Sequence, residues 1–68
     1  MKRDLIGAKD KKIGEVVMDN DGNLSFTGMA IGMFDNLLER LGKEELGRRL
    51  MTEGWSNGYL YLGPVEEE

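Results

Sequence analysis

Residues 27–54 read TGMAIGMFDNLLERLGKEELGRRLMTEG and contain the only sustained helical period in this chain of 68 residues. At about 100° per residue, the apolar residues of the first half of this stretch gather on one face. That spacing is typical of an amphipathic helix packed on a core. We expect Thr27 to be its N-cap and Gly42 to follow its last turn. The residues predicted to face the core are Ala30, Ile31, Phe34, Leu37, Leu38 and Leu41.

The second half of the stretch predicts a shorter helix over residues 43–53. Glutamates occupy its first turn and arginines come later, which is the order that the helix macrodipole favours. Gly54 is the expected residue after its end. Its apolar stripe is thin, chiefly Leu46 and Leu50, so we expect this helix to rest on its neighbour.

Short apolar runs on either side of the helices predict β-strands. Residues 4–8, 13–19 and 24–26 form three N-terminal strands, and residues 59–62 form a last strand that Gly63-Pro64 ends. The order is therefore β-β-β-α-α-β. We predict an α+β fold in which a small antiparallel sheet, three N-terminal strands plus a C-terminal strand, is covered on one face by two helices.

The segment Asn20-Asp21-Gly22 is a turn signal between the second and third strands, and its loop length decides the register. A two-residue loop would place acidic Asp19 on the apolar face. A three-residue loop with Gly22 in the left-handed conformation pairs Met18 with Leu24 and separates apolar from polar residues better. This preferred register places four apolar residues on one face: Val16, Met18, Leu24 and Phe26.

In the last strand the side chains alternate, with Leu60 and Leu62 predicted to point inward and Tyr59 and Tyr61 outward. The opposite orientation remains open, because all four side chains can pack. We expect one domain over residues 1–65, followed by an acidic disordered tail over residues 66–68.

Composition restricts the function classes. The net charge is −4, and the basic residues near the amino terminus are interrupted by Asp4 and Asp10, so direct nucleic-acid binding is disfavoured. An acidic protein can instead dock on the basic, nucleic-acid-binding surface of another protein. No signal peptide and no membrane span is evident, and we expect a cytoplasmic protein without membrane contact.

The residues that carry most catalysis are missing. The chain has no His and no Cys, so the usual proton shuttle, the best nucleophile and ordinary zinc sites are absent. Asp19 and Asp21 partly match a calcium loop, but the positions that need the first ligand and the bidentate glutamate hold Val17 and Gly28. We predict a protein that is not an enzyme and binds no cofactor or metal.

Residues outside the predicted apolar faces form the candidate interaction surface. The methionines can seal the flanks of the core or form an adaptable patch for a partner, and Trp55 can cap the core or bind. One hypothesis is a small protein that binds or inhibits another macromolecule, of a kind frequent in bacteria and bacteriophages. The alternative is a structural homo-oligomer, a homodimer for example, whose assembly is its function. The candidate residues are Met29, Met33, Arg40, Met51, Trp55, Tyr59 and Tyr61.

Overall fold

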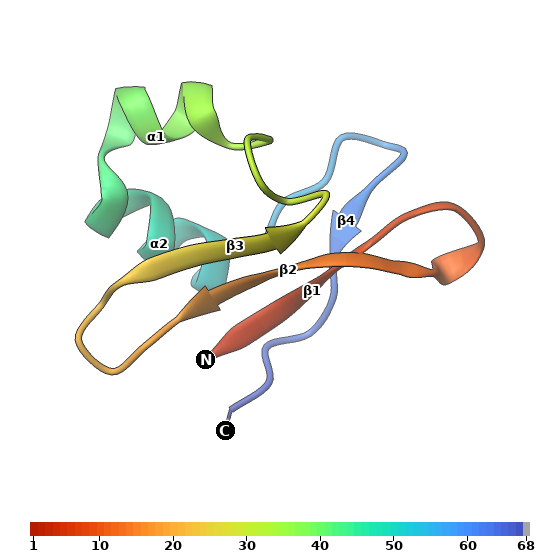
Figure 1. The fold of residues 1–68 in the computed structure, drawn as a ribbon, viewed down its shortest axis with the longest axis horizontal. Helices are drawn as coiled ribbons and strands as arrows, with labels where there is room; N and C mark the ends of the chain where they lie inside the picture. The colour runs from red at the N-terminus through yellow and green to blue at the C-terminus, as the bar shows by residue number, and fades with distance from the viewer. Residues whose placement is uncertain (68) are drawn as a thin grey trace.

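A computed structural model describes residues 1–67 and confirms the predicted α+β order (Figure 1). The helices lie together on one side of a four-stranded antiparallel sheet whose strand order is β3-β2-β1-β4. None of the helices within residues 1–67 is long and apolar enough to cross a membrane. The elements are β1 (Lys2–Ile6), the 3₁₀ turn η1 (Ala8–Asp10), β2 (Lys12–Met18), β3 (Leu24–Gly28), α1 (Asp35–Leu41), α2 (Lys43–Thr52) and β4 (Tyr61–Leu62).

The hairpin of β2 and β3 has the preferred register. Met18 pairs with Leu24, and the loop closes with a hydrogen bond of 3.0 Å from the Asp19 amide to the Asn23 carbonyl. Gly22 has a φ of 82°, the left-handed conformation that a three-residue loop requires. The Asp19 carboxylate also accepts amide hydrogen bonds from Asp21 and Asn23, so it organises the turn.

The first helix is shorter than predicted. Residues 29–34 form successive turns, and α1 begins only at Asp35. Thr27 lies in β3, so its assignment as an N-cap is wrong, and Phe34 precedes the helix without a side-chain cap. Ile31 was expected to face the core and is instead 69 % exposed. The helical wheel failed here because it assumes one continuous helix, whereas Gly28 and Gly32 have φ values of 60° and 82°.

The close approach of the β2 and β3 backbones where Gly14 pairs with Gly28 explains why the chain turns at Gly28. A Cβ on Gly14 would lie 2.5 Å from the Thr27 carbonyl oxygen, and one on Gly28 would lie 2.5 Å from the Ile13 carbonyl oxygen. No real Cβ tolerates such distances, so both positions need glycine. The Met29 amide donates to the Ile13 carbonyl at 2.9 Å and holds the two backbones together at this point. The segment that follows therefore leaves the sheet as turns.

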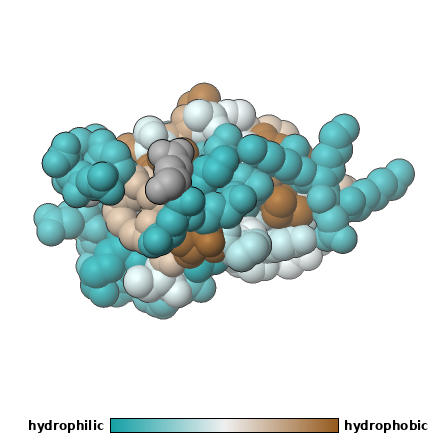
Figure 2. Space-filling model, turned by 90° about the horizontal axis from the view of Figure 1, so that it is seen from below, coloured by the Kyte–Doolittle hydropathy of each residue, from teal (hydrophilic) through white to brown (hydrophobic). Residues whose placement is uncertain are grey.

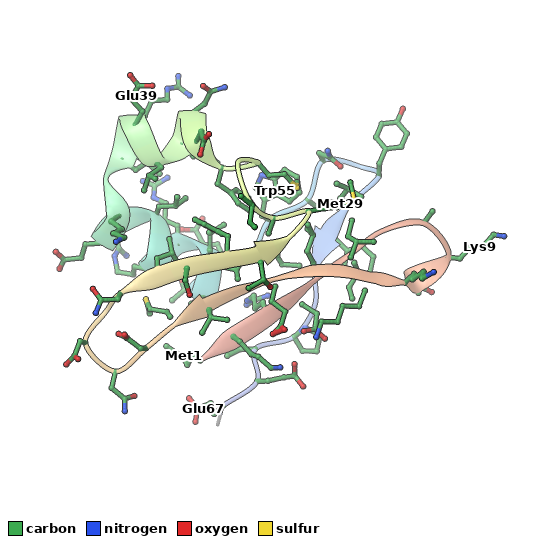
Figure 3. The ribbon with its side chains drawn as sticks, viewed as in Figure 1. Met1, Lys9, Met29, Glu39, Trp55 and Glu67 are labelled. Atoms are coloured by element: carbon green, nitrogen blue, oxygen red, sulfur yellow. The ribbon has the colours of Figure 1, made fainter. Side chains whose placement is uncertain are left out.

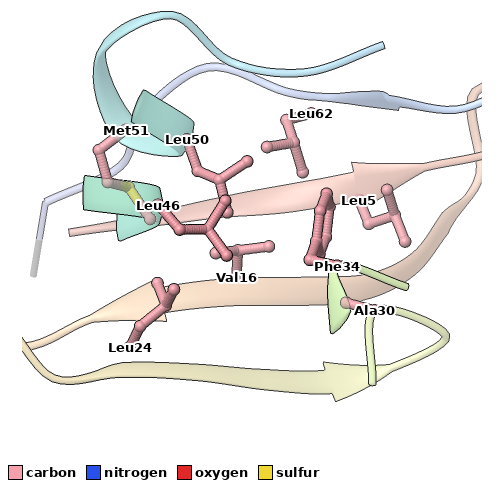
Figure 4. Close-up of a cluster of buried hydrophobic side chains, with 9 residues drawn as sticks. All are labelled: Leu5, Val16, Leu24, Ala30, Phe34, Leu46, Leu50, Met51 and Leu62. Carbon is pink, nitrogen blue, oxygen red and sulfur yellow. The ribbon is translucent and has the colours of Figure 1, made fainter. Parts of the chain in front are cut away.

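The core lies between the sheet and the helices (Figure 4). Phe34 is at its centre, stacked on Phe26 at 5.5 Å and meeting Trp55 edge-on at 5.2 Å between ring centroids. α2 ends one residue before the predicted end, and Gly54 follows with the expected positive φ. The buried apolar residues are Leu5, Val16, Leu24, Ala30, Phe34, Leu46, Leu50, Met51 and Leu62.

Arg3 shares the covered face of β1 with Leu5, although its sequence context reads as a charged surface. One guanidinium nitrogen donates to the Met51 carbonyl at the end of α2, and another donates to the Gly63 carbonyl after β4, each at 3.0 Å. Arg3 therefore ties the end of the second helix to the chain that leaves the last strand.

The chain beyond β4 continues along β1. Glu66 and Lys2 exchange two backbone hydrogen bonds of 2.8 Å each, so pairing reaches one residue past the predicted domain boundary at 65. Of the predicted acidic tail over residues 66–68, Glu68 lies outside the described residues.

Candidate interaction surface

Two loops meet at the end of the sheet where β1 enters η1. One is the turn segment 29–34, and the other, residues 53–60, connects α2 to β4. Phe34 and Trp55 join them through their edge-on ring contact. Ile13 lies near both loops. Its carbonyl accepts a hydrogen bond from the Met29 amide, and its side chain and that of Leu60 both lie next to Gly7. The labelled side chains of Met29 and Trp55 lie over this region in Figure 3.

These loops expose most of the large apolar side chains on the surface. Met29 is 60 % exposed, Ile31 69 % and Tyr59 86 %. A single exposed apolar residue is normal, but a concentration on adjacent loops is typical of an interaction site. We refer to this region as the loop surface and define it as Met29, Ile31, Met33, Trp55, Tyr59 and Tyr61.

The tip that presents Tyr59 is held by side chains of its own loop. The Asn57 carboxamide oxygen accepts from the amides of Tyr59 at 2.9 Å and Leu60 at 2.8 Å. The Ser56 hydroxyl accepts from the Gly58 amide at 3.3 Å. These local hydrogen bonds fix the turn and present Tyr59 outward in a defined position.

η1 borders the loop surface and has an unusual backbone. Lys9 and Asp10 have φ values of 60° and 58°, a conformation that costs a non-glycine residue about 1–2 kcal/mol. The Tyr61 hydroxyl donates to the Asp10 carboxylate at 2.8 Å. This hydrogen bond raises the pKa of the Tyr61 phenol, because ionisation would remove the proton that it donates. The contact fixes η1 against β4.

The structure separates the candidate residues that the sequence grouped. Met29 and Tyr59 are exposed, and Tyr61 is exposed to a smaller extent. Met33 and Trp55 are half-buried and pack against the core. These five lie on the two adjacent loops and β4. Ile31 joins them, and the sequence pattern missed it because the wheel placed it inside; Gly32 was the available signal that the helix is interrupted.

Two candidate residues do not belong to the loop surface. Met51 is 4 % exposed and is part of the core, so its assignment to an interaction surface is corrected. It lies on α2 and belongs to the buried apolar cluster between the helices and the sheet. Arg40 is exposed on α1 and follows Glu39, which Figure 3 places at the end of that helix away from Met29.

Two hollows offer few groups for chemistry, and the second of them reaches the loop surface at Trp55. One, of about 280 Å³, lies beside the hairpin and is lined in part by Asp19. The Asp19 carboxylate accepts hydrogen bonds within the turn, and those from Asn23 lower its pKa. The other, of about 170 Å³, is mainly apolar and lies between the helices and Trp55. Within residues 1–67, no three carboxylates lie close enough together to hold a metal ion.

Comparison of the chain with models of known protein families, with curated protein sequences and with solved structures gave no match.

Proposed function

We propose that this chain is a small non-enzymatic interaction protein that binds another protein through the loop surface. The observation that carries the proposal is the exposure of Met29, Ile31 and Tyr59 on two adjacent loops. Burying these side chains against a partner would make the free energy of binding more favourable by about 25 cal/mol for each Å² of apolar surface taken from water.

The residue types suit recognition. Met29 is flexible and can adapt to an irregular surface, whereas the ring of Tyr59 is rigid and loses little conformational entropy on binding. Tyr is also enriched among the residues that dominate binding energy. Because the turn at Asn57 already fixes the tip, the ordering cost on binding is reduced.

Charge points to the nature of the partner. A net charge of −4 favours approach to a basic surface, such as that of a nucleic-acid-binding protein, whose function this chain would inhibit by covering it. We also propose that the protein acts in the cytoplasm, which the absence of cysteine supports. A non-enzymatic role is supported by the absence of both His and Cys from the 68 residues.

The test is an affinity capture from the lysate of the native host, using the double variant Met29→Lys/Ile31→Lys beside the natural chain. Both side chains are exposed, so the variant should keep its thermal midpoint. We expect one stoichiometric partner that the variant binds at least about tenfold more weakly, the loss of roughly 1.4 kcal/mol.

The matched control is Asn36→Lys/Thr52→Lys, which adds the same charge at exposed positions of α1 and α2. It should retain the partner, which separates the loss of the apolar contact from a general effect of charge. A partner retained by the loop variant would contradict the proposed surface. Capture of no partner would contradict the binding function.

A further inference from the structure

The two edges of the sheet differ. On the side of β1, β4 pairs with Leu5 and Ile6, the Gly63 amide donates to the Asp4 carbonyl at 2.8 Å, and Glu66 pairs with Lys2. These contacts cover β1 from Lys2 to Ile6 and make β4 the outermost strand on that side. β4 is itself paired on its outer side, because the Leu62 amide donates to the Trp55 carbonyl at 3.0 Å and Ser56 forms a bridge with Tyr61. On the other side β3 is the outermost strand, and no strand within residues 1–67 lies beyond it (Figure 4).

The backbone of β3 presents unpaired groups to that open edge. Hydrogen bonds from Asp19 to Asn23 and from Met29 to Ile13 mark the two ends of its ladder with β2. Antiparallel pairs alternate between bonded and non-bonded, so Ser25 and Thr27 bond to β2 while Leu24 and Phe26 direct their amides and carbonyls outward. These groups can accept another strand.

β3 lacks the features that protect exposed edges. Its sequence, LSFTG, has no charged residue and no proline, and its pairing with β2 runs from Gly14–Gly28 to Met18–Leu24 without a bulge. Natural edge strands are usually blunted by lysine, proline or a bulge. β3 is therefore open to strand addition.

We infer that β3 pairs with β3 of a second copy of this chain, antiparallel and about a two-fold axis at Phe26. Phe26 then faces its counterpart, Leu24 faces Gly28, and Ser25 faces Thr27 of the other copy. Every one of these pairs is uncharged. The contact is isologous and joins two four-stranded sheets into one continuous sheet.

The distribution of charge favours a second copy in this orientation. The hairpin between β2 and β3 has Asp19 and Asp21 at one end of the long axis (Figure 1). η1 lies at the other end, where Lys9 and the following Lys11 outnumber Asp10. Figure 2 shows hydrophilic side chains projecting from both ends. An antiparallel pairing brings the acidic end of each copy toward the lysine end of the other, whereas a parallel pairing would bring like charges together.

The test uses the predicted register. In Ser25→Lys/Thr27→Lys, each of two cross-strand pairs between the copies brings two lysines together, which should weaken dimerisation about tenfold. In Ser25→Glu/Thr27→Lys, the same pairs become glutamate with lysine, and dimerisation should be at least as strong as that of the natural chain. Both side chains are exposed, so neither variant should unfold.

Sedimentation velocity at high micromolar protein measures the outcome. We expect the natural chain to approach twice the 7.7 kDa of one copy, the lysine variant to remain a monomer and the mixed-charge variant to be a dimer. A monomeric natural chain would overturn the inference. Dimers in all three proteins would place the contact elsewhere, and loss of the dimer in both variants would show that the two copies do not pair in the proposed register.

Discussion

The two faces of the sheet are stabilised in different ways. On the covered face, apolar side chains of β1, β2 and β3 pack against α2 and the Phe34 ring, and little water reaches them. On the open face, Lys12 bridges Glu15 at 3.2 Å and Asp4 at 3.5 Å, and Lys2 approaches Glu15 at 3.3 Å. Exposed ion pairs contribute little because water and salt screen them. We therefore expect the stability of the fold to reside almost entirely on the covered face.

The largest effect should come from Phe34→Ala. Its ring contacts Phe26 and Trp55 in the centre of the core, and truncation of a buried Phe costs about 3–5 kcal/mol. A domain of this size rarely has more than about 3–5 kcal/mol in total, so the variant should be largely unfolded at 25 °C. Urea unfolding followed by Trp55 fluorescence measures it. Tyr59→Ala, at an 86 % exposed aromatic, is the control and should unfold as the natural chain does.

The neighbours Arg3 and Lys2 test the comparison within one strand, because they point to opposite faces. Arg3→Ala removes two hydrogen bonds to the carbonyls of Met51 and Gly63 and should destabilise the fold by about 1–3 kcal/mol. Lys2→Ala removes only a half-buried ion pair with Glu15 on the open face, where water still screens it, and should change stability by less than about 0.5 kcal/mol.

Amide hydrogen exchange localises the effect of Arg3→Ala. Protection should fall first at Leu62 and Gly63 and at the end of α2, which the guanidinium joins. Equal destabilisation by Arg3→Ala and Lys2→Ala would mean that the covered face does not dominate.

The smallest effect should be that of acid on the open-face carboxylates. Hydrogen bonds from Lys12 and then Lys2 lower the pKa of Glu15 from its ordinary value of 4.5. A carboxylate whose pKa is lower in the folded state contributes stability above its ordinary pKa and loses it as the pH falls through the folded value. Thermal midpoints should therefore be flat near neutral pH and decline below about pH 4.

Glu15→Gln isolates the contribution of Glu15 to that decline. The variant should flatten the acid decline slightly, and high salt should reduce its difference from the natural chain, because the pair is exposed. A loss of stability at neutral pH as large as that of Arg3→Ala would show that the ion pairs of the open face matter far more than exposure allows.

Much of the fold follows from local patterns. Alternation of apolar residues with the three-residue Asn20-Asp21-Gly22 loop specified which residues of β2 and β3 share a face, and Leu62 points inward with Tyr61 outward as expected. The loop surface was only partly predictable. Met29 and Tyr59 were identified as residues outside the apolar faces, but Ile31 was assigned to the core and Met51 to the surface.

The sequence by itself determined the order β-β-β-α-α-β, the hairpin register and the end of α2 to within one residue, because each depends on residues close together in the chain. Only the tertiary structure decided the strand order, the short α1 and the half-buried position of Arg3. The turn at Gly28 depends on the approach of Gly14 from another strand, and Arg3 bonds to carbonyls at positions 51 and 63. Local periodicity contains no information on such distant contacts, so the strand order had to come from the fold itself.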